Sequence, residues 1–224
     1  MIKIDNDKLA YEREYLKLGY KYICGIDEVG RGCLFGPVTA AAVIMPLSLE
    51  NNKDIINGIE DSKKLTAKKR EELSKKIIEK SISYSIYSIS EKTIDEINIL
   101  NATKLAMINA VKNLKINPDI LFIDALKIDI DIKQISIIKG DLKSYSIGCA
   151  SILAKVCRDE IMSNLPEEYQ KYKISKNKGY GTKEHLEAIK KYGPSNMHRF
   201  SFEPIKSYNH KDKKNDNNKD SFIL

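Results

Sequence analysis

The side chains best suited to chemistry are acids that follow apolar stretches. Asp27 with Glu28, then Asp124, then Asp141 come at or just after three short apolar runs. Carboxylates are costly beside buried strands unless they are paired or bound to a cation. Four of them at neighbouring strand ends would need a counter-charge, which Mg²⁺ or Mn²⁺ can supply. Two such ions, about 3.5–4 Å apart, can promote phosphodiester hydrolysis. The pattern therefore favours a divalent-metal site.

Simpler interpretations of these acids stay open at this point. Residues 25–32, Gly-Ile-Asp-Glu-Val-Gly-Arg-Gly, could form a charged hairpin turn, Asp141 could cap a following helix, and Asp124 could be incidental. The turn explains the glycines but gives no reason for Asp27 inside an apolar flank. Because side chains alternate faces along a strand, we expect Glu28 to lie past the strand end, where glycine lets the backbone turn.

Three further stretches could contact phosphate. Gly30-Arg31-Gly32 offers backbone N–H groups and a guanidinium, and Ser62-Lys63-Lys64 is basic. Residues 176–181 are also basic, and Tyr180 lies there between two glycines, where an exposed ring can stack. The usual alternative for basic runs is a solvated surface. His185 is expected to be an ordinary residue of a first helical turn, and His198 with Arg199 to be surface decoration or a phosphate contact.

Composition limits the remaining function classes. The 224 residues suit one large domain, with 42% hydrophobic and 31% charged residues. The net charge of +7 favours an anionic partner such as nucleic acid. Four cysteines without a CxxC pair argue against disulfides and zinc. No apolar run approaches the roughly 18–20 residues of a membrane span, and the start is polar. We therefore expect a cytoplasmic protein that does not enter membranes.

The periodicity of apolar residues predicts an α/β chain. Helices are expected at about 5–20, from Thr66, from Ser90 or Thr93 to about 114, at 145–165 and at 182–192, with strands at about 22–27, 37–45, 83–90, 120–123 and 134–139. The strand at 120–123 is apolar on both faces, which indicates a central parallel strand. Residues 173–183 are expected to be a loop. The polar residues from Asn209 onwards cannot form a core and predict a disordered tail.

At this level of detail the sequence resembles a known family. The matching stretches are GIDEVGRG (25–32), GPVTAAAVIMP (36–46), DSKKL (61–65), IDEINILNATKLAM (94–107), FIDA (122–125), KGD (139–141), SIGCASILAKVCRDE (146–160) and KGYGTKEH (178–185). Together they resemble the type 2 ribonucleases H, the family of bacterial ribonuclease HII. The resemblance runs from about Gly19 to Lys206.

The resemblance implies a fold and an activity. The fold would be ribonuclease H-like, with a mixed five-stranded sheet flanked by helices and a C-terminal helical extension. Residues 1–20 would be an N-terminal helical arm, 21–208 the catalytic domain and 209–224 the tail. The activity would be cleavage of the RNA strand of RNA–DNA hybrids, and incision 5′ of single ribonucleotides in duplex DNA. Cofactors would be Mg²⁺ or Mn²⁺ in a two-metal site, and the protein would be a monomer; whether the tail binds a replication partner is left open.

The resemblance also assigns roles to residues. Asp27, Glu28, Asp124 and Asp141 would bind the metals and act in catalysis. Gly30, Arg31 and Gly32 would read the ribonucleotide, and Tyr180 would pack against the sugar at the RNA–DNA junction. Ser62, Lys63 and Lys64 would contact the DNA backbone. The chain departs from the family pattern at Cys33, Phe35, Gly148-Cys149 and the ending 198–202.

Two rival functions remain at this stage. Another ribonuclease H-like nuclease, such as a junction resolvase, would share the acids but not the pairing of Gly30-Arg31-Gly32 with Tyr180. A non-catalytic basic nucleic-acid-binding protein would need the lysines but not four acids. Divalent-dependent cutting of a duplex with one ribonucleotide would discriminate among the three.

Overall fold

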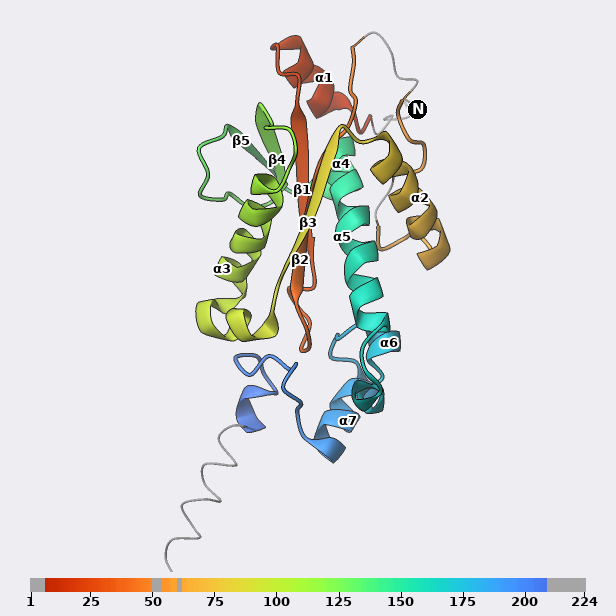
Figure 1. Cartoon of the computed structure of the whole chain (residues 1–224), viewed down its shortest axis with the longest axis vertical. Coiled ribbons are helices and arrows are strands. Elements are labelled where there is room, and N and C mark those ends of the chain that lie inside the picture. The colour runs from red at the N-terminus through yellow and green to blue at the C-terminus, as the bar shows by residue number, and fades with distance from the viewer. Residues whose placement is uncertain (1–6, 50–53, 60–61, 209–224) are drawn as a thin grey trace, which may run out of the picture.

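The fold is built on one mixed five-stranded sheet (Figure 1). The structure, a computed structural model, describes residues 7–49, 54–59 and 62–208. The strands are β1 (Ile23–Val29), β2 (Val38–Ile44), β3 (Ser83–Ile89), β4 (Ile120–Asp124) and β5 (Gln134–Ile137). Their order in the sheet is β3-β2-β1-β4-β5. The first three pair antiparallel, while β4 pairs parallel with both β1 and β5, so the parallel inner strand expected at 120–123 is confirmed.

Helices cover both faces of this sheet. They are α1 (Ala10–Lys17), α2 (Ala67–Lys80), α3 (Glu91–Lys112), α4 (Gly140–Lys143), α5 (Tyr145–Ser163), the 3₁₀ helix η1 (Glu167–Tyr172), α6 (Ile174–Asn177) and α7 (Lys183–Tyr192). Figure 1 shows α3 on one side of the sheet and α5 on the other, with α2 outside α5. The short helices α6 and α7 gather at one end of α5, which is the expected C-terminal helical part.

Hydroxyl side chains fix where the main helices begin. Thr66, Ser90, Ser144 and Thr182 precede α2, α3, α5 and α7, and each side-chain oxygen accepts an N–H three residues later. Such N-caps satisfy one of the amide donors that the first helical turn leaves unpaired. The sequence prediction of Thr66, Ser90 and Thr182 as caps is confirmed.

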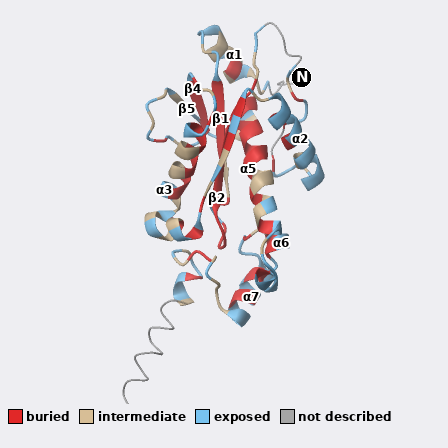
Figure 2. Ribbon diagram, viewed as in Figure 1, coloured by how far each residue is buried: buried red, intermediate tan, exposed pale blue. Residues whose placement is uncertain are grey.

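The core forms two layers, one on each face of the sheet (Figure 2). On one face, alternate residues of β1 and β2, such as Ile26 and Ala42, pack against Met107 and its neighbours on α3. On the other, Ala41 and Val43 pack against small residues of α5, such as Ala150. Because β1 and β2 are buried on both faces, their sequences are mostly apolar rather than alternating, apart from Thr39 and the two acids of β1. This double coverage holds β1 and its acids rigidly inside the molecule.

Several local expectations differ from the structure. Strand β1 runs through Val29 and pairs Glu28 with Ala40, so the expectation that Glu28 lies past the strand end is wrong. Asp141 lies in α4 rather than directly at the end of β5. The basic loop expected at 173–183 contains α6. The predicted tail, 209–224, lies outside the described residues. None of the helices formed by the described residues has the length and apolar character needed to cross a bilayer.

Candidate active site

All four acids line one cavity of about 580 Å³. Two of them come from β1, Asp124 from the last residue of β4, and Asp141 from α4. The cavity is completed by Val29, Ser62, Lys63, Arg70, Ser151, Lys155 and Tyr180. Side chains that are spread over more than 150 positions of the sequence therefore meet at one place.

The two acids of β1 can reach the cavity because the pairing between β1 and β4 stops just before them. Pairing between β1 and β4 ends at Ile26 with Ile123, so the β4 side of β1 is uncovered from Asp27 onwards. Asp27 is 6% exposed, and its Oδ1 accepts the N–H of Glu28 at 2.8 Å. Burial, then the charge of Glu28, raises the pKa of Asp27 well above its usual range, and the Ser151 hydroxyl, which bonds the carboxylate, opposes that rise. Burial also raises the pKa of Glu28, against the effect of Arg31.

The other two acids are joined through the backbone. Asp124 Oδ1 accepts the N–H of Gly140 at 2.7 Å, which fixes the residue just before Asp141. Burial raises the pKa of Asp124, the Gly140 bond opposes the rise and the charge of Asp141 adds to it. Both carboxylates line the same cavity.

The chemistry of this acid set fits a divalent cation. Oxygen ligands from several carboxylates are what Mg²⁺ and Mn²⁺ prefer. Glu28 Oε2 is buried without a hydrogen-bond partner among the described residues, so it has an unused ligand position. Raised pKa values are what crowded, uncompensated acids produce. Within the described residues no three His, Cys, Asp or Glu side chains lie close enough together to hold an ion as they stand.

Of the three residues predicted to contact the DNA backbone, Ser62 and Lys63 line the cavity and Lys64 does not. Ser62 is buried, and its hydroxyl lies 3.0 Å from that of Ser151, which bonds Asp27. Lys63 lines the cavity and its charge acts on Asp124. Lys64 is exposed and does not line the cavity. Ser62 and Lys63 therefore connect this segment to the acids, while Lys64 is exposed outside the cavity.

The Gly30-Arg31-Gly32 turn is held from behind by two buried arginines. Arg31 Nη1 lies 3.3 Å from Glu28 Oε1 at the cavity side. Gly30 has a φ of +93°, and an added Cβ would lie 2.3 Å from Arg158 Nε, so only glycine fits here. Arg199 donates to the carbonyls of Gly36 and Arg31, both at 2.9 Å. Arg199 and His198 are fully buried, so the expectation that they decorate the surface is wrong.

Tyr180 is held next to this turn by a second set of backbone bonds. Arg158 Nη1 donates to the carbonyl of Lys178 at 2.8 Å, while its Nε and Nη2 donate to the carbonyls of Pro37 and Phe35. Leu34 N–H donates to the Gly179 carbonyl at 2.8 Å. The loop at 178–180 is thus bonded to residues 34–37, which follow the turn at 30–32. Tyr180 lies at the cavity with 39% of its surface exposed.

Two histidines form a chain of hydrogen bonds that ends at the backbone carbonyl of Tyr180. Ser195 N–H donates to His198 Nδ1 at 2.8 Å, which leaves the proton of neutral His198 on Nε2. That Nε2 donates to His185 Nε2 at 3.2 Å, so the His185 proton sits on Nδ1 and is donated to the Tyr180 carbonyl at 2.9 Å. Burial, then the neighbouring His185, lowers the pKa of His198 to about 3. The pair is therefore neutral and orients the tyrosine loop.

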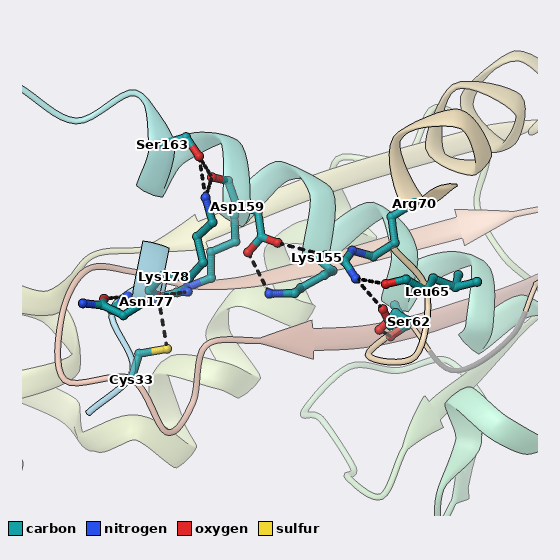
Figure 3. A network of polar contacts seen from close by, with 12 residues as sticks. Cys33, Ser62, Leu65, Arg70, Lys155, Asp159, Ser163, Asn177 and Lys178 are labelled. Atoms are coloured by element: carbon teal, nitrogen blue, oxygen red, sulfur yellow. Dashed lines mark hydrogen bonds and ion pairs between the residues drawn. The ribbon is translucent and has the colours of Figure 1, made fainter. Parts of the chain in front are cut away.

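A further polar network ties the basic side chains together (Figure 3). In Figure 3, Lys155 and Arg70 approach the carboxylate of Asp159 from one side, with Lys155 Nζ at 2.7 Å. Arg70 also donates to the backbone carbonyl of Ser62 at 2.9 Å. On the other side Lys178 Nζ donates to the Asp159 carbonyl at 3.3 Å. Asp159 therefore connects the Ser62 segment with the Tyr180 loop.

Sequence reasoning missed Ser151, Lys155 and Arg70 as cavity residues. Ser151, Lys155 and Asp159 recur at four-residue spacing and share one face of α5. That polar stripe on a helix otherwise packed against the sheet was the available signal.

Comparison with known proteins agrees with this geometry. The family model described as Ribonuclease HII matches residues 24–205 of the chain. The chain belongs to the ribonuclease HII family. Ribonuclease HII of Caldicellulosiruptor bescii is 55% identical over 199 residues, which cover 88% of this chain and 94% of that protein. The ribonuclease HII of Bacillus subtilis is 48% identical over 199 residues, 89% of this chain and 76% of that protein.

The fold of this ribonuclease HII family member also matches solved structures. The ribonuclease H2 of Pyrococcus horikoshii OT3 has a TM-score of 0.68 at 26% identity, covering 86% of this chain and 99% of that one. The expected ribonuclease H-like fold is therefore confirmed, and so is the assignment to a family of nucleases, which are hydrolases.

Proposed function

We propose that the protein cleaves the RNA strand of RNA–DNA hybrids and incises duplex DNA on the 5′ side of single embedded ribonucleotides. The observation that carries this proposal is the meeting of Asp27, Glu28, Asp124 and Asp141 with Tyr180 on one cavity. The acids that would catalyse hydrolysis and the tyrosine that would contact a sugar of the substrate then lie at the same cavity.

The four acids would hold two Mg²⁺ or Mn²⁺ ions. When bound, such ions supply an activated water and stabilise charge on the leaving oxygen, and the products carry 3′-OH and 5′-phosphate ends. The chain's own contribution is to bring the four carboxylates to one cavity, where burial raises the pKa of Asp27, Glu28 and Asp124. Lys63 and Lys155 add positive charge at the cavity wall, which favours the phosphate of the substrate.

Recognition of the ribonucleotide would be divided between two segments. Backbone groups of Gly30-Arg31-Gly32 can approach the 2′-OH, which both donates and accepts hydrogen bonds. The Tyr180 ring would contact the sugar of the next deoxynucleotide, where an added hydroxyl would lose its hydration without a partner. Arg158 bonds the carbonyls of Lys178, two residues before Tyr180, and Phe35, three residues after Gly32, which would keep the two segments at a fixed spacing.

Binding along the duplex would use the segment that begins at Ser62. The side chains of Lys63 and Lys64 would contact DNA phosphates, and Ser62 would hold the segment to α5 through Ser151. We also propose that residues 1–20 form an arm, 21–208 the catalytic domain and 209–224 a tail dispensable for chemistry. The protein would act as a cytoplasmic monomer.

The test is a cleavage assay on a DNA duplex that contains one ribonucleotide. We expect a single nick on its 5′ side that requires Mg²⁺ or Mn²⁺ and stops with a chelator. A four-way junction without ribonucleotides is the control substrate. Cutting of the junction in preference to the ribonucleotide duplex would favour a resolvase, and binding of the duplex without metal-dependent cutting would favour a non-catalytic binding protein.

A further inference from the structure

Helix α1 buries an acid rather than an apolar side chain. Among the residues of α1, all of which are described, only Glu12 is buried, and it is 0% exposed. Its Oε1 accepts the Ser144 hydroxyl at 2.6 Å and the Ser146 N–H at 2.9 Å. A fully buried carboxylate is costly unless it is hydrogen-bonded or paired, and these two bonds offset part of that cost. Both of its partners lie at the junction of α4 and α5, directly after Asp141.

A lysine four residues earlier contacts the same junction. Lys8 Nζ donates to the backbone carbonyl of Asp141 at 2.6 Å. The carbonyl of Lys8 accepts the N–H of Tyr145 at 2.8 Å. An added Cβ at Gly148 would lie 3.2 Å from Lys8 Nζ and 3.3 Å from the Asp141 carbonyl, so this glycine leaves space for the contact. Lys8 and Glu12 are thus hydrogen-bonded to the segment from residue 141 to residue 146.

These hydrogen bonds lie next to Asp141, the one of the four acids that does not belong to a strand. Asp27 and Glu28 belong to β1, where their backbones pair with β2, and Asp124 is the last residue of β4. Asp141 instead lies in the four-residue helix α4, which follows Lys139 with a left-handed φ of +57°. Figure 1 shows α1 at the same end of the molecule as α4 and the start of α5. The bonds to Lys8 and Glu12 restrain this segment in addition to the bond from Gly140 to Asp124 at the end of β4.

We propose that the N-terminal arm is part of the metal site, with Lys8 and Glu12 as positioning residues that hold Asp141 where it can bind the cation. This inference rests on the proposed function, since it takes Asp141 as a metal ligand. It assigns the arm a role beyond packing, because removing these contacts should change metal affinity before it changes the fold.

The first test measures Mn²⁺ binding to the full chain by titration calorimetry, without nucleic acid. Lys8→Met keeps the stem of the side chain but removes its donor. Groups that orient a metal ligand typically contribute about 10–100-fold in metal affinity, and we expect a loss of this size. Lys17→Met, which replaces an exposed lysine at the end of α1, is the control and should bind Mn²⁺ as the wild type does. Equal Mn²⁺ affinity of wild type and folded Lys8→Met would overturn the proposal.

The second test separates positioning from simple packing. Glu12→Gln keeps an oxygen that accepts from Ser144 and Ser146, whereas Glu12→Ala removes it. We expect Glu12→Gln to retain Mn²⁺ affinity and Glu12→Ala to lose it, with exposed Glu14→Gln as control. If both Glu12 variants bind Mn²⁺ as tightly as the wild type, Glu12 has no positioning role. Circular dichroism verifies that each variant is folded.

Activity measurements distinguish this inference from the proposed function. On a ribonucleotide duplex, Lys8→Met should need more metal for half-maximal rate and recover at high metal. If the wild type binds Mn²⁺, loses it in Lys8→Met, yet never cuts the duplex, the positioning role stands and the proposed function fails. If the wild type cuts and Lys8→Met has an unchanged metal requirement, the proposed function stands and the positioning role fails.

Discussion

Asp124 Oδ1 accepts the backbone N–H of Gly140 at 2.7 Å, so one acid of the site fixes the approach to another. The bond uses one carboxylate oxygen of Asp124 and leaves the second for a cation. It also sets the start of α4, which carries Asp141. Under the proposed function Asp124 would therefore have two roles, and its replacement has to be designed so that the bond to Gly140 survives.

Replacing Asp27 by Asn should stabilise the metal-free protein at neutral pH. The folded-state pKa of Asp27 is raised, mainly by burial, so its favourable contribution is present below the unfolded value of 3.8 and is lost as pH rises through the folded pKa. At pH 7 the ionised form is therefore a burden that Asn removes. Melting temperatures in chelator should be higher for Asp27→Asn than for wild type at pH 7, with the difference shrinking towards pH 4.

The same melts with added Mg²⁺ provide the complementary result. A ligand that binds only the folded state raises its stability. Mg²⁺ should therefore stabilise the wild type and the exposed control Asp129→Asn, but much less the Asp27→Asn variant. A variant that melts below the wild type in chelator, and still responds fully to Mg²⁺, would refute the assignment of Asp27.

The histidine pair should make the protein acid-sensitive. The pKa of His198 is lowered to about 3, mainly by burial, so the stability it contributes is present above the unfolded value of 6.5 and is lost as pH falls below it. Urea midpoints of the wild type should drop between pH 7 and pH 5. His198→Gln should be less stable at pH 7, by about 1–3 kcal/mol for a buried polar group left unpaired, yet lose less on acidification. Parallel pH profiles of His198→Gln and wild type would contradict this role; His210→Gln is the control.

Much of the fold was predictable because its signals are local. The apolar runs of β1, β2 and β4 and the hydroxyl caps of α2, α3 and α7 are written in a few consecutive residues each. The burial of His198 and Arg199 was not predictable in this way. Their partners, Phe35, Gly36 and Arg31, lie more than 160 residues earlier in the chain. The contact between Lys8 and Asp141 is hidden for the same reason, since it joins residues 133 positions apart.

Lys63 and Lys64 should each contribute to the salt dependence of duplex binding. Each phosphate contact that is lost lowers the slope of log affinity against log salt by about 1. We expect this for Lys63→Ala and Lys64→Ala, measured in the Asp124→Asn background so that the duplex stays intact. Lys17→Ala on the arm should keep the original slope. Slopes that stay unchanged in both variants would remove this segment from the DNA interface.

Tyr180→Ala should damage single-ribonucleotide incision more than cleavage of a uniform RNA–DNA hybrid. Loss of an aromatic contact to a nucleotide costs roughly 1–3 kcal/mol, or about 5–150-fold in rate if the contact is made in the transition state. The loss should fall mainly on the substrate with a deoxynucleotide after the ribonucleotide. Tyr192→Ala, on the exposed side of α7, is the matched control. Equal losses on both substrates would make Tyr180 a general packing residue.

The most direct measurement of the central claim is the rate at which Asp124→Asn nicks a duplex that contains one ribonucleotide. Asn retains an oxygen that can accept the Gly140 N–H, so the fold and duplex affinity should be preserved while the charge that a cation needs is lost. The rate with Mg²⁺ or Mn²⁺ should fall by more than the roughly 10–100-fold that loss of a mere supporting group causes. An Asp124→Asn protein that nicks the duplex at near the wild-type rate with the same metal would contradict the account.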